Sequence, residues 1–209
     1  PILIGQIQVV EIPDMERARD GVQTQKQKII DLANSFHPRM VARGGGAVDL
    51  DIHTYPLPSF DSEMLVVHLH VDTRDAMGAN LVNSMCEGVA SLIETITDGK
   101  VFLRILSNLA DRALAKARVT LTPDQLAGRG YSGEEVRDGI IIASDFALAD
   151  PYRAATHNKG IMNGIDSVSL PTGNAWRSIR SRPPALAPRG RSHYTPLSHL
   201  CSSSRVHLC

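Results

Sequence analysis

Residues 64–106 read MLVVHLHVDTRDAMGANLVNSMCEGVASLIETITDGKVFLRIL, and this stretch decides the fold. Every second side chain over residues 65–71 is apolar, while His68 and His70 point the other way, as in a strand with one buried face. VFLRIL at 101–106 predicts a further strand. Between the two strands, apolar residues recur every three or four positions and predict an amphipathic helix: Met77, Leu81, Met85, Val89, Leu92 and Ile96.

The residues before this stretch predict the other half of the same unit. PILIGQIQVV at 1–10 is short and rich in branched apolar residues, and it predicts a strand that ends before a turn at Pro13 and Asp14. A helical pattern follows, carried by Met15, Ala18, Val22, Ile29, Ile30 and Ala33.

A glycine-rich loop, residues 44–46, then leads into VDLDIHT at 48–54. This segment alternates, and it predicts a half-buried strand with Val48, Leu50 and Ile52 on one face and Asp49, Asp51 and His53 on the other. The resulting order βαββαβ is that of a ferredoxin-like domain, a four-stranded antiparallel sheet with both helices on one side.

Beyond Ser107 the pattern becomes mostly helical, and we place a domain boundary near 107–112. LADRALAKARV at 109–119 predicts a helix, and a turn follows at Thr122 and Pro123. Ser132, with Glu135 three residues later, is typical of a capping box at the start of a helix that ends near Asp150. Pro151 suits the first turn of the last helix.

The sequence therefore predicts an α+β fold with three parts. Residues 1–108 form the ferredoxin-like small domain, and residues 109–176 form part of a larger, mainly helical α/β domain. Residues 177–209 form an irregular tail whose first part, 177–191, is rich in arginine and proline. This tail is either a basic arm for nucleic acid or a disordered or mistranslated segment. If a reading-frame error produced residues 177–191, resequencing the coding DNA should find a shifted frame there.

The composition excludes several classes of protein. The 22 basic and 22 acidic residues cancel, so no global field attracts nucleic acid or an anionic membrane. There is no apolar run long enough to span a bilayer. Cys86, Cys201 and Cys209 match neither a disulfide framework nor a zinc pattern, which favours a reducing, cytoplasmic location.

Two glycine-containing segments are candidates for binding a nucleotide. RDAMGAN at 74–80 lies where a strand meets a long helix, and helix N-termini bind phosphate through free N–H groups. The same residues also fit Asp75 as an ordinary N-cap. The glycine loop followed by Asp49 fits an adenosine ribose, whose hydroxyls donate to a carboxylate, although it also fits a merely mobile loop. Neither segment is the GxGxxG of a Rossmann domain.

A polar cluster, DPYRAATHNKGIMNGIDSV at 150–168, is the third candidate. Lys159, among His157, Asn158 and Asn163, is suited to stabilise negative charge on a carbonyl oxygen. The alternative is a solvated surface lysine. His68 and His70 lack a third ligand at a recognisable spacing, so we predict no metal site.

Three motifs together resemble the class II (bacterial-type) 3-hydroxy-3-methylglutaryl-CoA reductases. They are RDAMGAN at 74–80, RILSNLAD at 104–111 and DPYRAATHNKGIMNGID at 150–166, and the likeness runs from about residue 5 to about residue 176. The resemblance implies a small NAD(P)H-binding domain inserted in a larger acyl-CoA-binding domain, with the active site at a dimer interface. It also implies reduction of the thioester by two hydrides to mevalonate and free CoA, or the reverse reaction.

The resemblance also implies roles for particular residues. Lys159 is similar to the catalytic lysine, with Arg153 and Asn163 beside it in the substrate site. Asp49 is similar to the residue that meets the adenine-side ribose, which favours NAD(H) over NADP(H) because a carboxylate repels a 2′-phosphate. The contacts to the cofactor pyrophosphate and nicotinamide correspond to Asp75, Met77, Gly78, Ala79 and Asn80.

The chain departs from the family pattern in ways that affect catalysis. The family has an aspartate in TGNDWR that tunes the lysine, and this chain has Ala175 in TGNAWR. The family's catalytic glutamate, in an ENVIG segment, and its general-acid histidine lie outside these 209 residues, so none of the eight histidines is assigned that role.

Two other readings remain open. One is an inactive fragment or pseudo-enzyme that still binds dinucleotide. The other is a ferredoxin-like RNA-binding module, which needs aromatic residues on its central strands to stack bases. The strand at 101–106 offers only Phe102, and the net charge is zero.

Overall fold

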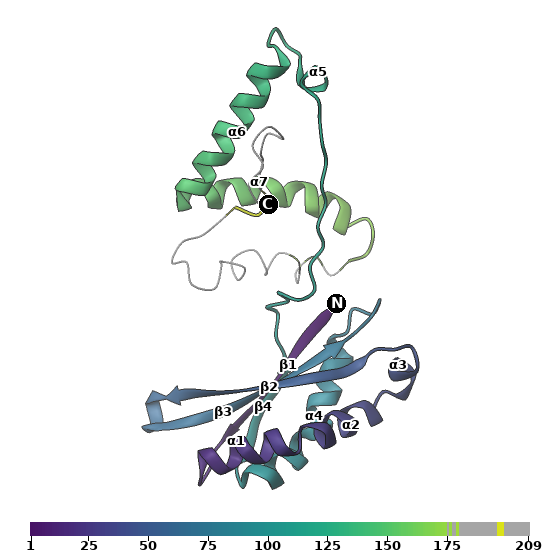
Figure 1. The fold of residues 1–209 in the computed structure, drawn as a ribbon, viewed down its shortest axis with the longest axis vertical. Coiled ribbons are helices and arrows are strands. Elements are labelled where there is room, and N and C mark those ends of the chain that lie inside the picture. Colours follow the sequence, from purple (N-terminus) through teal and green to yellow (C-terminus); the bar gives the residue numbers. More distant parts are fainter. Residues whose placement is uncertain (175, 177–178, 180–195, 199–209) are drawn as a thin grey trace. The chain divides into compact units, whose positions relative to one another are not determined.

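The chain forms two compact units, Pro1–Leu114 and Ala115–Cys209 (Figure 1). The structure is a computed structural model that describes residues 1–174, 176, 179 and 196–198. Ala175 and nearly all of the predicted tail, 177–209, therefore lie outside the described residues. The division between the units falls after Leu114, whereas the sequence places it after residue 108.

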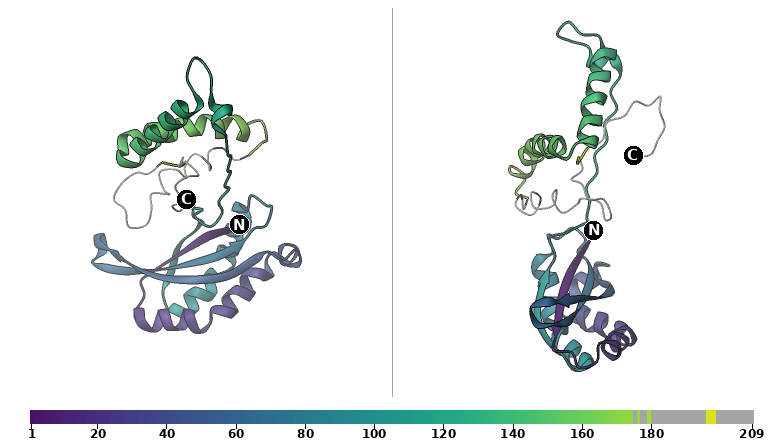
Figure 2. Two further views of the ribbon diagram at one scale, coloured as in Figure 1. Left: turned by 45° about the horizontal axis from the view of Figure 1, so that its top comes forward. Right: turned by 90° about the vertical axis from the view of Figure 1, so that its left-hand side faces the viewer.

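Unit 1 contains a four-stranded sheet with helices on one of its faces (Figures 1 and 2). Its strands are β1 (Ile2–Val10), β2 (Gly46–Leu57), β3 (Ser62–Asp72) and β4 (Lys100–Leu106). Neighbouring strands are antiparallel and follow the order β2-β3-β1-β4. The covering helices are α1 (Met15–Thr24), α2 (Lys26–Ser35) and α4 (Ala79–Thr97), with short helices α3 (Pro38–Ala42) and η1 (Pro58–Phe60) in connections. The predicted α+β class and its antiparallel sheet are confirmed.

The core lies between this sheet and its helices, where the sequence predicts it. Leu65, Val67, Leu69 and Val71 of β3 are all fully buried. On α4, the residues of the predicted stripe from Leu81 to Ile96 are buried or half-buried against them. The apolar face of the strand, which repeats every two residues, thus packs against the apolar face of the helix, which repeats about every 3.6 residues.

Three local predictions in unit 1 are wrong. The helix predicted to continue from Met15 to Ala33 breaks at Gln25, because α1 packs on α4 while α2 packs on both β2 and α4. Val48 is 52% exposed, since a bulge between Ala47 and Asp49 turns it outward. Met77 is 68% exposed, because α4 begins two residues after it.

The connection 107–122 contains no helix, contrary to the prediction for 109–119. The segment is rich in alanine, which favours a helix, but tertiary contacts at its start outweigh this helix propensity. Ala110 is buried with the core cluster, and the carbonyl of Arg112 accepts a hydrogen bond from the N–H of Ile2 at 3.3 Å. An α-helix needs the backbone groups of successive turns for itself.

The described part of unit 2 is helical, with α5 (Pro123–Leu126), α6 (Gly133–Ala149) and α7 (Pro151–Ser169). The capping box is confirmed: the N–H of Glu135 donates to Ser132 Oγ at 3.3 Å, and the N–H of Ser132 donates to Glu135 Oε2 at 2.8 Å. Pro151 occupies the first turn of α7 as predicted. No helix in the described residues is long and apolar enough to cross a membrane.

Candidate cofactor and substrate site

Five of the predicted cofactor residues lie in the turn between β3 and α4 or in the first turn of α4. Gly78 is the N-cap of α4 with a φ of 84°, and an added Cβ would lie 2.4 Å from Cγ2 of Thr73. No side chain caps this 19-residue helix, so the N–H groups of its first turn have no side-chain acceptor among the described residues. Such a terminus is a favourable position for a phosphate. The residues present therefore fit the pyrophosphate of a dinucleotide.

The other residues of this turn are accessible. Asp75 is not the N-cap, as the alternative interpretation required. Its carboxylate is largely exposed and forms an ion pair with Arg43. Met77 is exposed, and Ala79 and Asn80 form the start of α4.

The glycine loop lies beside this turn, although the two are about 30 positions apart in the sequence. Arg74 donates to the carbonyl of Gly44, and an added Cβ on Gly45 would lie 2.7 Å from the carbonyl oxygen of Asp72. Arg43, next to the loop, reaches Asp75 in the turn. The structure thus brings together the two glycine-containing segments that the sequence singles out.

Asn34 of α2 holds the far end of the glycine loop. Its side-chain amide donates to the carbonyl of Ala47 at 2.9 Å, and its Oδ1 accepts from the N–H of Ala47 at 2.7 Å. Gly46, with a φ of 106°, leaves room for this amide, because an added Cβ would lie 2.4 Å from Asn34 Oδ1. The loop is therefore tied to α2 at one end and to Arg74 at the other.

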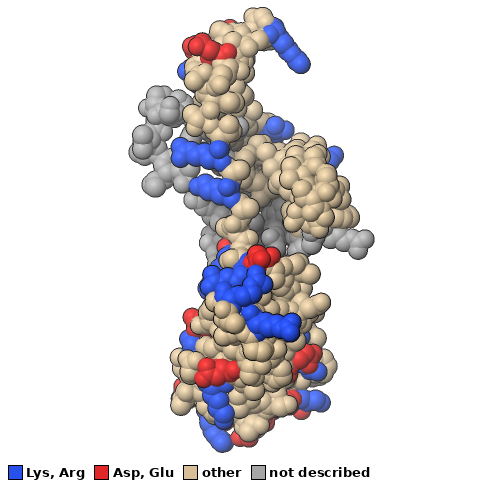
Figure 3. Space-filling view, turned by 90° about the vertical axis from the view of Figure 1, so that its right-hand side faces the viewer, with Lys and Arg blue, Asp and Glu red and all other residues tan. Residues whose placement is uncertain are grey.

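Basic side chains gather on this side of unit 1. Figure 3 shows Lys and Arg side chains next to a carboxylate on the face turned to the viewer. Beside the start of α4, Arg43 and Arg74 are both exposed, and they pair with Asp75 and Asp72. A guanidinium carries five N–H donors, so each arginine keeps donors for an anionic ligand at this helix N-terminus.

Asp49 lies on β2, opposite His70 of β3. Lys26, the first residue of α2, forms an ion pair with its Oδ1, and the N–H of Leu50 donates to the same oxygen at 2.8 Å. The hydrogen bond from Lys26 holds the pKa of the Asp49 carboxyl below its usual value. Asp49 is therefore an ionised, half-exposed acceptor, as the ribose role requires.

His70 lies within contact distance of two charged side chains, Arg112 and Asp51. Arg112 Nη1 lies 3.0 Å from His70 Nδ1, and Asp51 Oδ2 lies 3.0 Å from His70 Nε2. Because arginine only donates, Nδ1 is the acceptor and Nε2 carries the proton. Burial lowers the pKa of His70, and this keeps the ring neutral beside the guanidinium. No three metal-ligating side chains cluster in the part of the chain that the structure describes.

The predicted catalytic residues lie on α7, in unit 2. Lys159 and Asn163 are exposed and one turn apart, so they share a face of the helix. Arg153 is half-buried, six residues before Lys159 and on a different face. Lys159 makes no hydrogen bond or ion pair with any described residue.

The other members of the polar cluster have a different role. The Nε2 of His157 lies 2.7 Å from Ser198 Oγ, and the N–H of Leu197 donates to Asn158 Oδ1 at 2.7 Å. These side chains hold residues 196–198 against α7 rather than surrounding Lys159. Among the described residues, no atom beyond the chain neighbours and the helix's own backbone lies within 4 Å of a Cβ built on Gly160 or Gly164.

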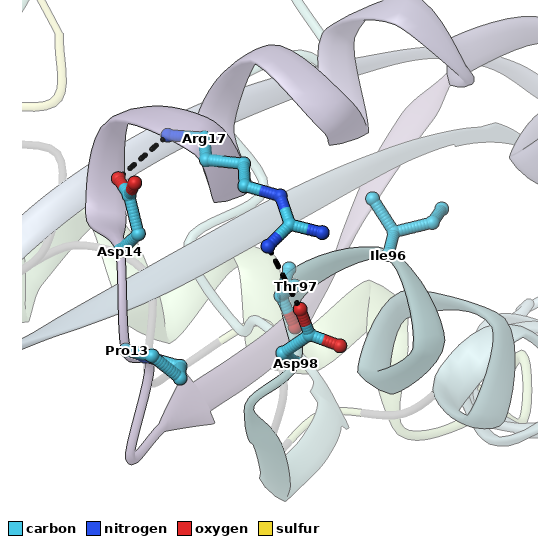
Figure 4. A pocket seen from close by; sticks show the side chains of 6 residues that line it. All are labelled: Pro13, Asp14, Arg17, Ile96, Thr97 and Asp98. Atoms are coloured by element: carbon cyan, nitrogen blue, oxygen red, sulfur yellow. Dashed lines mark hydrogen bonds and ion pairs between the residues drawn. The ribbon is translucent and has the colours of Figure 1, made fainter.

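A small pocket at the opposite end of α4 contains none of the predicted site residues. It lies between the start of α1 and the end of α4, where Arg17 pairs with Asp98 at 3.3 Å and Asp14 accepts from the N–H of Arg17 at 3.0 Å (Figure 4). These contacts stabilise two helix ends. The pocket is therefore part of the scaffold.

Several residues of the site have no signal in the sequence. Lys26, Asn34, Arg43 and Arg112 are ordinary polar residues in helices or connections, and their partners lie 13 to 42 positions away. Lys26 in particular lies 23 positions before Asp49 (49 − 26). The packing of α2 beside β2 brings Lys26 and Asn34 to their partners, and the connections after α3 and β4 carry Arg43 and Arg112 to theirs.

Gly78→Ala tests whether the turn needs its glycine. We expect a loss of about 2 kcal/mol in the free energy of unfolding, because φ is positive and the new Cβ meets Thr73. Urea unfolding followed by circular dichroism measures it. Gly139→Ala is the matched control: its site in α6 is open, so the same change should stabilise by about 0.5–1 kcal/mol. Equal effects at both positions would contradict this account of the turn.

The chain is similar to known proteins over most of its length. Residues 1–189 match the family model described as hydroxymethylglutaryl-coenzyme A reductase. The chain is 47% identical over 197 residues to 3-hydroxy-3-methylglutaryl-coenzyme A reductase of Archaeoglobus fulgidus, covering 94% of this chain and 43% of that protein. A probable 3-hydroxy-3-methylglutaryl-coenzyme A reductase of Borreliella burgdorferi is 37% identical over 132 residues, covering 63% of this chain and 30% of that protein.

Solved structures are similar as well. 3-Hydroxy-3-methylglutaryl-coenzyme A reductase of Streptococcus pneumoniae matches with a TM-score of 0.82 at 38% identity, covering 95% of this chain and 46% of that one. A structure of the class II enzyme from the same organism, bound to NADPH in open conformations, matches with a TM-score of 0.79 at 38% identity, covering 94% and 46%. The chain thus spans less than half the length of these relatives.

Proposed function

The chain belongs to the hydroxymethylglutaryl-coenzyme A reductase family, and on that premise we propose that it supplies the cofactor-binding and lysine-bearing parts of such a reductase. The reaction is reduction of 3-hydroxy-3-methylglutaryl-CoA to mevalonate and CoA with two NAD(P)H, or its reverse. The observation that carries the proposal is the uncapped, glycine-led N-terminus of α4 beside the glycine loop.

Unit 1 binds the dinucleotide in this proposal. The first-turn N–H groups of α4 and the neighbouring Arg43 and Arg74 attract the pyrophosphate, while Asp49 accepts from the adenine-side ribose. The exposed Met77 offers an apolar surface to the nicotinamide end. The bound cofactor supplies hydride. Asp49 favours NAD(H), although the relative from Streptococcus pneumoniae was solved with NADPH.

Unit 2 supplies the electrophilic assistance. The Lys159 ammonium polarises the thioester carbonyl, so that negative charge developing on the oxygen lies against a cation. Asn163, one turn further on, and Arg153 bind the acyl-CoA.

We further propose that the reductase is a homo-oligomer built from dimers that share active sites. We also propose a reducing, cytoplasmic location, because the three cysteines match no disulfide framework.

A second candidate is a dinucleotide-binding chain without turnover, and Ala175 favours it. In the family pattern an aspartate at this position hydrogen-bonds the lysine and tunes its proton affinity. Alanine provides no such acceptor.

One experiment separates the two candidates. The purified chain is titrated with NADH and NADPH to measure binding. The rate of acyl-CoA reduction is then measured for two full-length proteins, one with Ala175 and one with Ala175→Asp. We expect binding without turnover by the chain as written, and at least about tenfold faster reduction in the full-length Ala175→Asp protein. If neither nucleotide binds, the cofactor assignment fails; if Ala175→Asp leaves the rate unchanged, position 175 has no catalytic role.

A further inference from the structure

The contact between Lys26 and Asp49 is asymmetric. Both donors that reach the carboxylate, the Lys26 ammonium and the N–H of Leu50, bond to Oδ1. Oδ2 has no hydrogen-bond partner among the described residues. The carboxylate is therefore held in place through one oxygen and presents the other.

Both side chains are accessible to a ligand. The Lys26 side chain is 33% exposed and that of Asp49 is 48% exposed. An ammonium has three protons and Asp49 uses one, so Lys26 can still donate to a second anion. The pair thus presents an acceptor and a donor side by side at the edge strand β2.

The pair also changes the electrostatics of the ribose subsite. An unpaired aspartate disfavours NADP(H), because its charge repels a 2′-phosphate. Here an ammonium in direct contact balances that charge. The neighbouring His70 is neutral and bonded to Arg112, so it adds no positive charge of its own.

We propose that Lys26 is a specificity-determining residue that allows this site to accept NADPH as well as NADH. Asp49 Oδ2 accepts from the 2′-hydroxyl of NADH, and the Lys26 ammonium donates to the 2′-phosphate of NADPH. This inference rests on the proposed function, and in particular on Asp49 as the ribose-binding residue.

The test compares Lys26→Gln with the original chain in fluorescence titrations with NADH and NADPH. We expect the Kd for NADPH to rise about tenfold, as for the loss of one charge-assisted hydrogen bond, while the Kd for NADH stays within about twofold. Lys26→Arg keeps the charge and should retain NADPH binding. Lys28→Gln is the matched control, since Lys28 lies two residues on in α2 and its ammonium donates to Gln25 Oε1 at 3.4 Å rather than to Asp49.

A second readout requires no nucleotide. In carboxyl ¹³C NMR titrations, Lys26→Gln should raise the pKa of Asp49 towards its ordinary value, and Lys28→Gln should leave it unchanged. An Asp49 pKa that does not respond to Lys26→Gln would show that the pair does not form in solution, and it would overturn the inference.

The outcomes separate this inference from the proposed function. If both nucleotides bind and Lys26→Gln leaves the ratio of their Kd values unchanged, or Lys28→Gln changes it equally, the specificity role of Lys26 is wrong and the cofactor site stands. If the original chain binds neither nucleotide, the cofactor site is wrong and the inference falls with it.

Discussion

Lys159→Met is expected to lower kcat for acyl-CoA reduction about a thousandfold in the full-length Ala175→Asp protein, as for the loss of an oxyanion-stabilising group. The lysine acts on charge that develops in the transition state, so the KM for the acyl-CoA should change by less than about threefold. Steady-state kinetics measure both quantities.

Lys159→Met should change catalysis without disturbing the fold. Lys159 is exposed on α7 and has no partner among the described residues, and methionine is a good helix former, so the free energy of unfolding should change by less than about 0.5 kcal/mol. Lys116→Met, in the connection before α5, is the control for removing one exposed lysine. A kcat within tenfold of the parent would remove Lys159 from the mechanism.

Gly5→Ala is expected to cost about 3 kcal/mol of unfolding free energy, because it overpacks the centre of unit 1. Gly5 lies on β1 between β3 and β4, and an added Cβ would lie 2.3 Å from Cys86 Sγ and 2.8 Å from Val82 Cγ1. Both neighbours are fully buried, so neither can move into solvent. Urea denaturation monitored by circular dichroism reports the loss.

Cys86→Ala in the same chain should restore part of this stability, because it removes the nearest atom. The pKa of Cys86 is raised to about 12, so the thiol is neutral and behaves as a small apolar group. The double-mutant cycle should therefore give a favourable interaction energy of about 1 kcal/mol or more. Additive effects would mean that the strand and helix separate to accommodate the methyl group. Gly160→Ala, at an open position of α7, controls for the change in backbone freedom.

The sequence predicts those features whose determinants are close together in the chain. The alternation from Leu65 to Val71 identifies β3, because neighbouring side chains of a strand point to opposite faces. Ser132 and Glu135 identify the start of α6, because a capping box needs only four consecutive residues. The three long motifs likewise identify the family, which the comparisons confirm over residues 1–189.

Local pattern fails where contacts from distant residues determine the conformation. The segment 109–119 has helical composition, yet its first residues pack on the sheet and bond to Ile2 and His70 instead. Val48 fits the alternation of β2, but the bulge beside it turns it outward. In both cases long-range pairing outweighs a propensity of a few tenths of a kcal/mol per residue.

By itself, then, the sequence determined the antiparallel α+β unit, the family, and Asp49, Gly78 and Lys159 as its candidate site residues. Only the tertiary structure decided that the glycine loop lies beside the α4 turn, that Asn34 and Arg74 hold that loop, and that Lys26 pairs with Asp49. The physical reason is that ion pairs and hydrogen bonds depend on distances in space. A strand and a helix far apart in the chain become neighbours only after the sheet has formed its register.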